Sequence, residues 1–321
     1  MNELSKDAVS WLTVGDDSEG QRIDNFLLGK LKGVPKSHVY RILRSGEVRL
    51  NKGRVAPDAR LAVGDVVRVP PVRTAAPTAG DKPRAARPFR PAIALEDDCI
   101  IVVDKPAGLA VHGGSGIALG LIEQLRAARP AARFLELVHR LDRDTSGLLL
   151  VAKRRSALTD LHAQLRDGTV DKRYLALVRG PWPRQTVIVD APLHKYSTRE
   201  GERRVRVDET GRPSKTTFRL ERVWKVSEPP LALLEAELES GRTHQIRVHL
   251  AHIGHALAGD DKYGDFEWNR QLSRDGLKRM FLHARSLRFR HPGTGEPANV
   301  EAPLPAELAG YLKRLAGESK F

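Results

Sequence analysis

The sequence predicts an α+β protein with a small N-terminal module and a larger domain built on a mixed, largely antiparallel sheet flanked by helices. Three observations predict this arrangement. Apolar residues recur at helical spacing within residues 21–44, strand-like apolar runs dominate residues 92–321, and residues 71–91 lack apolar periodicity. Because strands and helices do not alternate regularly in the larger domain, repeated βαβ units are not expected.

The composition is that of a folded protein rather than a disordered or membrane-spanning one. Hydrophobic residues make up 40% of the 321 residues, and the single cysteine, Cys99, excludes a disulfide framework and any site with several cysteine ligands. No apolar run approaches the roughly 18–20 residues that span a bilayer. The first twenty residues contain five acids and one lysine, with no apolar signal segment. We therefore expect a soluble protein of the cytoplasm.

Positive charge is concentrated near the N-terminus. The formal net charge is +14, and residues 21–73 alone contain 12 Lys/Arg against 4 Asp/Glu, whereas residues 92–321 contain 37 against 30. Dense local positive charge is the pattern expected for binding a phosphate backbone, because each neutralised phosphate releases counterions. The alternative is a solvated basic face that only keeps the protein soluble. The density favours a nucleic-acid partner.

The small module is expected over residues 21–70, after a loosely ordered lead-in of residues 1–20. A first helix is indicated by apolar spacing at i, i+3, i+4 and i+8, and Gly33 and Pro35 end it. Ser37 can cap a second helix, and alternation predicts strands at residues 47–51 and 65–69. The apolar positions that define the two helices are Ile23, Phe26, Leu27 and Leu31, followed by Val39, Ile42 and Leu43.

A linker separates this module from the larger domain. Residues 71–91 are rich in Pro, Ala, Thr and Arg, so we expect a flexible segment there. The larger domain, residues 92–321, opens with a buried strand at residues 99–104. A helix is predicted at residues 157–166, and further strands are predicted at residues 174–179, 216–220, 231–238 and 243–248.

Residues 138–151, VHRLDRDTSGLLLV, are the first of three segments in which polar residues interrupt apolar surroundings. A charged tetrad meets a Thr-Ser-Gly turn, and a strand with a fully buried pattern follows. Such a turn would hold Asp142 on a rigid element that faces a cleft. The alternative is a salt-bridged loop in which His139 and Asp142 only stabilise the turn.

The other two segments are less decisive. Tyr174 lies early in residues 171–178, where a core position is the commoner role for a strand aromatic. In residues 240–249, SGRTHQIRVH, cationic and apolar residues alternate as they would along a strand. A buried Arg247 would need a carboxylate partner, and Asp142 is a candidate.

A metal or phosphate site is the competing interpretation of these segments. His244, His249, His252 and His255 lie within twelve residues, but no metalloprotease pattern and no supporting cysteine accompany them. Capping or RNA contact explains these histidines equally well. The glycine-rich residues 113–116 could hold a phosphate, but no Lys-Ser/Thr pair follows them.

Together the motifs resemble a known combination of domains. Residues 21–70 resemble the S4 RNA-binding domain, in the runs QRIDNFL and PKSHVYRILRSGEVRLN and the turn at residues 63–65. The larger domain resembles the RluA-type pseudouridine synthases, whose signature is HRLDRDTSGLLL at residues 139–150. DKPAGLAVH, KRYLALV, GRTHQIRVHL and GDDKYG accompany it in the family's order. The resemblance is closest to the branch that modifies large-subunit ribosomal RNA.

This resemblance implies roles for the matching residues. Asp142 matches the essential aspartate, Tyr174 the tyrosine that stacks on the base, and Arg247 the arginine paired with the aspartate. Arg140 matches the arginine that fills the gap left by the flipped nucleotide. Substrate-binding roles are implied for Lys105, Pro106, Arg242 and His244, and RNA-binding roles in the S4 module for Lys36, Ser37, Arg41, Arg44 and Arg49.

The resemblance also implies the activity. That family breaks the N1–C1′ bond of uridine and rejoins the uracil through C5 in a cleft of the catalytic domain. We therefore expect an enzyme without cofactor or metal that acts as a monomer on specific uridines of 23S ribosomal RNA. Arg247 is expected to hold Asp142 in its charged form against the effect of burial.

Two other classes of function stay open at this point. A non-catalytic RNA-binding or ribosome-assembly factor would explain the charge, but not the coexistence of Asp142, Tyr174 and Arg247. A metal-dependent hydrolase would require the histidines of residues 244–255 to converge.

Overall fold

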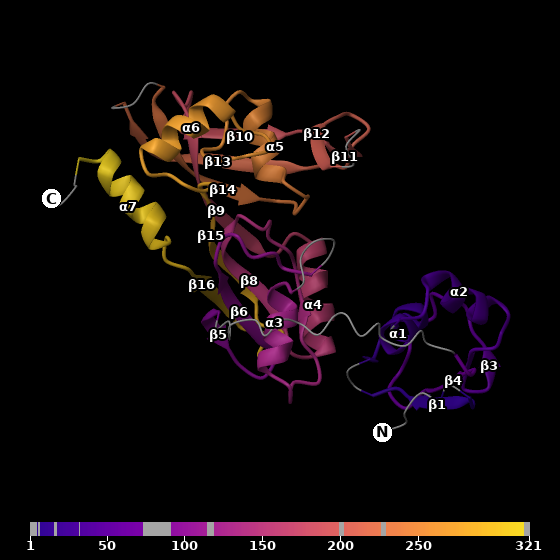
Figure 1. The fold of residues 1–321 in the computed structure, drawn as a ribbon. Coiled ribbons are helices and arrows are strands. Elements are labelled where there is room, and N and C mark those ends of the chain that lie inside the picture. Colours follow the sequence, from indigo (N-terminus) through magenta and orange to yellow (C-terminus); the bar gives the residue numbers. More distant parts are fainter. Residues whose placement is uncertain are drawn as a thin grey trace. The chain divides into compact units, whose positions relative to one another are not determined.

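The computed structural model describes residues 5, 7–15, 18–31, 33–72, 91–113, 119–198, 202–225 and 229–317. The chain divides into two compact units, one of residues 1–88 with 154–156 and one of residues 89–153 and 157–321. Each unit is described by itself, and both are drawn in Figure 1. Most of the predicted linker, residues 73–90, lies outside the described residues.

The smaller unit contains two helices and a four-stranded antiparallel sheet. Its helices are α1 (Ile23–Lys30) and α2 (Lys36–Arg44), and the sheet order is β1-β4-β2-β3. The seven apolar positions predicted for the helices are all buried in one core. The strands are β1 (Ser10–Thr13), β2 (Arg49–Leu50), β3 (Gly53–Arg54) and β4 (Val66–Val69).

Two details of the predicted module are wrong. Residues 10–13 are not a loose lead-in, because β1 pairs with β4 and Leu12 is buried in the core. Alternation over four residues was too short a signal to identify this strand. Ser37 does not cap α2, which begins one residue earlier and has Pro35 at its N-cap position.

The larger unit is built on one ten-stranded sheet with the order β10-β13-β14-β9-β15-β8-β6-β5, to which β16 and β7 are added at β15 and β8. Every pairing is antiparallel except that of β8 with β15, so the predicted mixed, largely antiparallel sheet is confirmed. A separate hairpin is formed by β11 and β12. The sheet strands are β5 (Ala92–Glu96), β6 (Ile100–Lys105), β7 (Glu136–Leu137), β8 (Ser146–Ala152), β9 (Asp171–Arg179), β10 (Thr186–Asp190), β13 (Lys215–Trp224), β14 (Leu231–Leu238), β15 (Leu282–Arg290) and β16 (Pro297–Glu301), and the hairpin strands are β11 (Leu193–Ser197) and β12 (Arg203–Val207).

Helices cover both faces of this sheet, as alternation along the buried strands requires. Apolar residues of α3 (Leu121–Ala128) and α5 (Gln245–His252) share one core with alternate residues of β6, β8, β9 and β14. The intervening residues of β6 and β8 pack with α4 (Arg155–Arg166). Residues of β9 and β14 that face away from the first core pack with α6 (Phe266–Arg274) and α7 (Ala306–Leu315).

The strand predicted at residues 243–248 is wrong, because this segment enters α5. Residues 245–250 are all buried, so this part of the helix presents no face to solvent. A short helix buried on every side shows no helical periodicity, and its β-branched residues then favour a strand prediction. None of the described helices is long and apolar enough to cross a membrane.

Candidate active site

A pocket of about 330 Å³ opens in the larger unit between the loop that precedes β8, the first half of β9 and the start of α5. This volume is within the roughly 300–1,000 Å³ typical of ligand sites. The sheet thus brings together groups as distant in sequence as Asp142 and Arg247, which are 105 positions apart. The predicted site residues that line the pocket are Arg140, Asp142, Tyr174, Arg242, His244 and Arg247.

The loop that carries Asp142 is anchored by a glycine at the start of β8. Gly147 has a φ of +108°, and a Cβ there would lie 2.2 Å from the carbonyl oxygen of Ala284 on β15. Only glycine allows both this conformation and this approach. The Thr-Ser-Gly turn of the sequence therefore fixes the position at which the Asp142 loop leaves the sheet.

Lys105 fixes the same loop through a hydrogen bond to its backbone. Its side chain is completely buried, and its Nζ donates to the carbonyl oxygens of Pro106 and Leu109 at 2.9 Å and of Arg143 at 3.0 Å. Burial lowers the pKa of Lys105 to about 7. The substrate-binding roles predicted for Lys105 and Pro106 find no support, because neither lines the Asp142 pocket. Both line a separate hollow of about 870 Å³ that does not contain Asp142.

His139 belongs to the framework of the loop as well. The backbone N–H of Leu150 donates to its Nε2 at 3.1 Å, so this nitrogen is an acceptor and the ring is uncharged. Burial lowers the pKa of His139 to about 4, which agrees with that assignment. This contact places His139 as an orienting residue.

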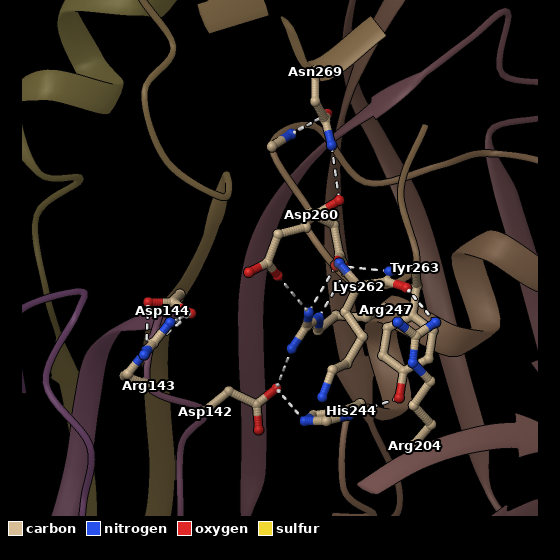
Figure 2. A network of polar contacts seen from close by, with 12 residues as sticks. Asp142, Arg143, Asp144, Arg204, His244, Arg247, Asp260, Lys262, Tyr263 and Asn269 are labelled. Atoms are coloured by element: carbon tan, nitrogen blue, oxygen red, sulfur yellow. Dashed lines mark hydrogen bonds and ion pairs between the residues drawn. The ribbon is translucent and has the colours of Figure 1, made fainter. Parts of the chain in front are cut away.

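Arg247 lies between two carboxylates (Figure 2). Its Nε and Nη2 donate to Asp260 at 2.7 Å each, and its Nη1 donates to Oδ2 of Asp142 at 3.2 Å. The predicted approach of Arg247 to Asp142 is present. The stronger partner is Asp260, which the sequence analysis did not assign.

Asp260 is held as firmly as the arginine it binds. Gly259 has a φ of +74° and lies so close to Arg279 that a Cβ would come within 2.4 Å of its carbonyl oxygen. Asn269 on α6 accepts from the N–H of Gly259 at 2.8 Å and donates to the carbonyl of Asp260 at 2.7 Å. The Gly-Asp pair within GDDKYG was the available signal for this residue.

The charges of this cluster stabilise one another. Burial disfavours the charged form of Arg247, but the hydrogen bonds and charge of Asp260, with those of Asp142, raise its pKa above the ordinary value. Burial likewise opposes ionisation of Asp260, and the Arg247 guanidinium outweighs it and lowers the pKa of that carboxyl. Arg247 is therefore a permanent cation at the pocket floor.

His244 reaches Asp142 from a second direction. It has a left-handed backbone, with φ of 55° and ψ of 21°, at the N-terminal end of α5. Its Nδ1 lies 2.8 Å from the hydroxyl of Tyr263, and its Nε2 lies 3.8 Å from Oδ2 of Asp142. Since the N–H of Val205 donates to the Tyr263 hydroxyl, that hydroxyl is available to donate to Nδ1. The hydrogen of His244 then lies on Nε2, the nitrogen whose contact with Asp142 is drawn in Figure 2.

The aromatic and cationic residues predicted for the pocket differ in exposure. Tyr174 on β9 is 6% exposed, and burial together with the charge of Asp142 raises its pKa, so its ring is an uncharged wall. Arg140 and Arg242 are exposed at the rim. The Nε of Arg242 donates to the carbonyl of Pro213 at 3.3 Å.

Lys172 is a pocket residue that the sequence analysis missed. It lies two positions before Tyr174, so both side chains are on the same face of β9. Its side chain is buried, its Nζ donates to the carbonyl of Val170 at 3.3 Å, and burial lowers its pKa. A lysine in phase with the strand aromatic was the signal that could have identified it.

The S4-module residues predicted to bind RNA lie on the surface of the smaller unit. All five are exposed. Arg41 pairs with Glu47 at 3.3 Å, Arg44 donates to the carbonyl of Tyr40 at 3.2 Å, and Arg49 to that of Lys52 at 3.3 Å. The five are Lys36, Ser37, Arg41 and Arg44 on α2 and Arg49 on β2.

The histidines of residues 244–255 do not converge. His249 is completely buried and contacts the Thr216 hydroxyl at 2.9 Å and the carbonyl of Ala191 at 3.0 Å. In the described part of the chain no group of three or more His, Cys, Asp or Glu residues could hold a metal ion. Most of the glycine-rich loop at residues 113–116 lies outside the described residues.

Comparison with known sequences gives matches to both units. A family profile described as RNA pseudouridylate synthase matches residues 99–252, and an S4 domain profile matches residues 21–67. A protein named ribosomal large subunit pseudouridine synthase C, from Pasteurella multocida (strain Pm70), is 54% identical over 96% of this chain and 94% of its own length. Proteins of the same name from Yersinia pestis and Escherichia coli (strain K12) are 55% and 52% identical over 96% of this chain and 96% and 97% of their own.

Solved structures of two human proteins have similar folds. Human RNA Pseudouridylate Synthase Domain Containing 1 matches with a TM-score of 0.57 at 29% identity, over 69% of this chain and 86% of that one. Human RNA Pseudouridylate Synthase Domain Containing 4 matches with a TM-score of 0.55 at 25% identity, over 70% and 92%.

Proposed function

Because the chain belongs to the RNA pseudouridylate synthase family, we propose that it isomerises specific uridines of large-subunit (23S) ribosomal RNA to pseudouridine, with Asp142 as the catalytic carboxylate. The observation that carries this proposal is the carboxylate of Asp142, which a buried guanidinium holds at the floor of a pocket. The relatives that share over half of this sequence along nearly its whole length are named for the large ribosomal subunit.

The reaction needs a carboxylate with one oxygen held and one oxygen free. The N1–C1′ bond breaks, a C5–C1′ bond forms, and a proton leaves C5 while N1 gains one, so no oxidant or reductant is consumed. Arg247 and His244 both approach Oδ2 of Asp142. Within the described residues Oδ1 accepts no hydrogen bond, so it is the atom that can act as nucleophile or base.

The remaining pocket residues fit the handling of an extruded nucleotide. Removing a base from its stack costs a few kcal/mol, which stacking on a new aromatic surface offsets. The buried ring of Tyr174 supplies such a surface on the pocket wall. Arg140, exposed at the rim, can enter the vacated stack, and Arg242 can contact the phosphate backbone beside it.

The smaller unit has the composition and fold of an RNA-holding module. Its two helices and sheet carry the exposed cations Lys36, Arg41, Arg44 and Arg49, which supply salt-sensitive affinity for a large RNA. We assign RNA binding to this S4 module, residues 21–70, and catalysis to residues 92–321. We further propose that the protein acts as a monomer without an obligate protein partner. A ribosomal substrate places this activity in the cytoplasm.

The test is the substitution Asp142→Asn, which keeps the shape of the side chain and removes its charge. We expect RNA binding to persist and pseudouridine formation to fall by at least about a thousandfold. The measurement is chemical mapping of pseudouridine in large-subunit RNA from a strain without the gene, after treatment with each protein.

Asp144→Asn is the matched control, because Asp144 lies two residues away in the same loop and, among the described residues, its side chain pairs only with exposed Arg143. This variant should modify the RNA as the wild type does. Retained product formation by Asp142→Asn would rule out the enzymatic assignment and favour a binding factor.

A further inference from the structure

A second pocket adjoins the one that contains Asp142. It has a volume of about 570 Å³ and shares Arg140, Gly241, Arg242 and Thr243 with the first, so the two hollows meet at these residues. Its other walls come from the β11–β12 hairpin and from residues 210–212. Any strand whose nucleotide enters the first pocket has this second pocket as its neighbour.

The second pocket is lined by cations without anions. No Asp or Glu occurs among the described residues that line it. In the described part of the chain the side chains of Arg140, Lys195 and Arg212 form no ion pair or hydrogen bond, and Arg242 has only its bond to a backbone carbonyl. The basic side chains of the lining are Arg140, His194, Lys195, Arg212 and Arg242.

Two other cations on the same hairpin, Arg204 and Arg206, are neutralised. Arg206 pairs with Asp208 at 2.8 Å and lies over the ring of Tyr196, and Arg204 pairs with Glu202 at 2.8 Å. The pattern follows strand alternation, since Lys195 and its cross-strand partner Val205 share the face that carries the pocket. The fold thus pairs its cations on one face of the hairpin and leaves them unpaired on the other.

Like charges gathered without counterions repel one another, so the arrangement is stable only at some cost unless an anion occupies it. Guanidinium groups match phosphate oxygens through two parallel hydrogen bonds. RNA supplies one phosphate for each nucleotide, and phosphate contacts fix the position of a strand without reading its sequence.

We propose that this second pocket binds a backbone phosphate of the RNA strand next to the uridine that enters the Asp142 pocket, with Arg212 and Lys195 as its dedicated ligands. The proposal rests on the proposed function, because it takes the extruded uridine as its reference point. Arg140 and Arg242 connect the two pockets, so the phosphate and the base are held on opposite sides of one pair of arginines. This hold resists return of the nucleotide to its stack.

The first experiment compares Arg212→Gln and Lys195→Gln with Arg206→Gln in the full-length protein. Each change removes one positive charge from the hairpin or its base, but Arg206 is paired on the outer face. With a large-subunit RNA fragment, we expect KM to rise about fivefold to tenfold for the two pocket variants and kcat to stay near that of the wild type. The slope of log(kcat/KM) against log(salt) should become less negative by about 0.7 for each lost contact with single-stranded RNA. Arg206→Gln should leave both quantities unchanged.

The second experiment locates the phosphate. A series of RNA fragments carries one uncharged methylphosphonate linkage each, at successive positions around the target uridine. One linkage should raise KM for the wild type by the factor seen for Arg212→Gln, and the same linkage should cost Arg212→Gln nothing further.

The outcomes separate this inference from the proposed function. If the wild type forms pseudouridine but every neutral linkage affects the wild type and Arg212→Gln equally, the pocket does not bind phosphate. If the wild type forms no pseudouridine, the salt dependence is measured instead by equilibrium binding, as the slope of the logarithm of RNA affinity against log(salt). The two proteins compared are then Asp142→Asn and the double variant that also carries Arg212→Gln. An unchanged slope there overturns the inference independently of catalysis.

Discussion

Arg247 donates hydrogen bonds to two carboxylates that differ in almost every other respect, while a third, exposed Asp261, lies 3.5 Å from its Nη2. Asp260 is completely buried and accepts four hydrogen bonds, two from Arg247 and one each from the backbone N–H groups of Lys262 and Tyr263. The Asp142 side chain is 16% exposed and accepts one hydrogen bond from Arg247, at 3.2 Å. One carboxylate therefore holds the arginine in place, and the other keeps an oxygen without a hydrogen-bond donor among the described residues.

The difference follows from the energetics of buried charge. A guanidinium taken out of water must be compensated by several well-aligned bonds, or its desolvation exceeds the attraction it gains. Asp260 supplies that compensation completely. Asp142 can therefore make a single longer hydrogen bond to the same arginine and leave one of its oxygens free. Because Asp260 holds the guanidinium, the cation stays in place if Asp142 forms other bonds.

The largest expected effect distinguishes the two carboxylates by stability. Asp260→Asn leaves buried Arg247 with only the longer contacts to Asp142 at 3.2 Å and to exposed Asp261 at 3.5 Å, so the free energy of unfolding should fall by about 3–5 kcal/mol. Asp142→Asn removes the same charge from a partly exposed position and should cost less than about 1 kcal/mol. Urea unfolding of both variants beside the wild type measures the two values, and equal losses would show that the carboxylates share the structural role.

The sequence predicted Asp142, the carboxylate proposed to react, but did not identify Asp260, the carboxylate that supports the arginine. Asp142 and Arg247 lie in long motifs, and the family resemblance of those motifs, rather than their spacing, implied that the two residues meet. The Gly-Asp pair at residues 259–260 was a local signal, but it does not by itself show that Asp260 rather than Asp261 turns inward, because that also depends on an amide of α6 that packs against it. Contacts made by distant elements are fixed only when the chain is folded.

The same limit explains the errors around the site. The strand prediction at residues 243–248 failed because α5 is buried on every side and leaves no periodic signal. The burial of Lys105 was not predicted, because a lysine beside a proline in a motif gives no indication of it. The sheet class was predictable, since alternation in long strands such as β14 survives any change in their neighbours.

The second expected effect concerns how Asp142 is oriented. His244→Ala removes the Nε2–H that faces Oδ2 of Asp142, and we expect kcat to fall about tenfold with KM little changed, since the lost contact acts through the aspartate. His244→Gln restores an N–H donor at a similar reach and should recover most of that loss. Both variants keep the left-handed backbone of residue 244, so its strain cancels in the comparison.

Tyr263→Phe tests the same arrangement without touching His244. The variant removes the hydroxyl that fixes the tautomer, so kcat should fall less than in His244→Ala, and combining the two changes should add nothing. Burial lowers the pKa of His244, although charged neighbours, Asp142, Arg247, Lys262 and Asp260, also act on it. The wild type therefore uses the uncharged imidazole ring. Additive losses, or failure of Gln to recover activity, would assign His244 a proton-transfer role instead.

The smallest expected effect is a pH dependence of the unfolding free energy that comes from Asp260 alone. Its folded pKa is below the ordinary value of 3.8, so the folded protein binds fewer protons there than the unfolded chain. The stability it contributes is complete above pH 3.8 and is lost as the pH falls through the folded pKa, by at most about 1.4 kcal/mol for each pH unit. The difference in unfolding free energy between the wild type and Asp260→Asn should therefore be constant at neutral and mildly acidic pH and shrink only below 3.8. A difference in unfolding free energy that already declines near pH 6 would indicate that a histidine titrates there. His244, which lies near Asp260 beside Arg247, would then share the stabilising role assigned to Asp260.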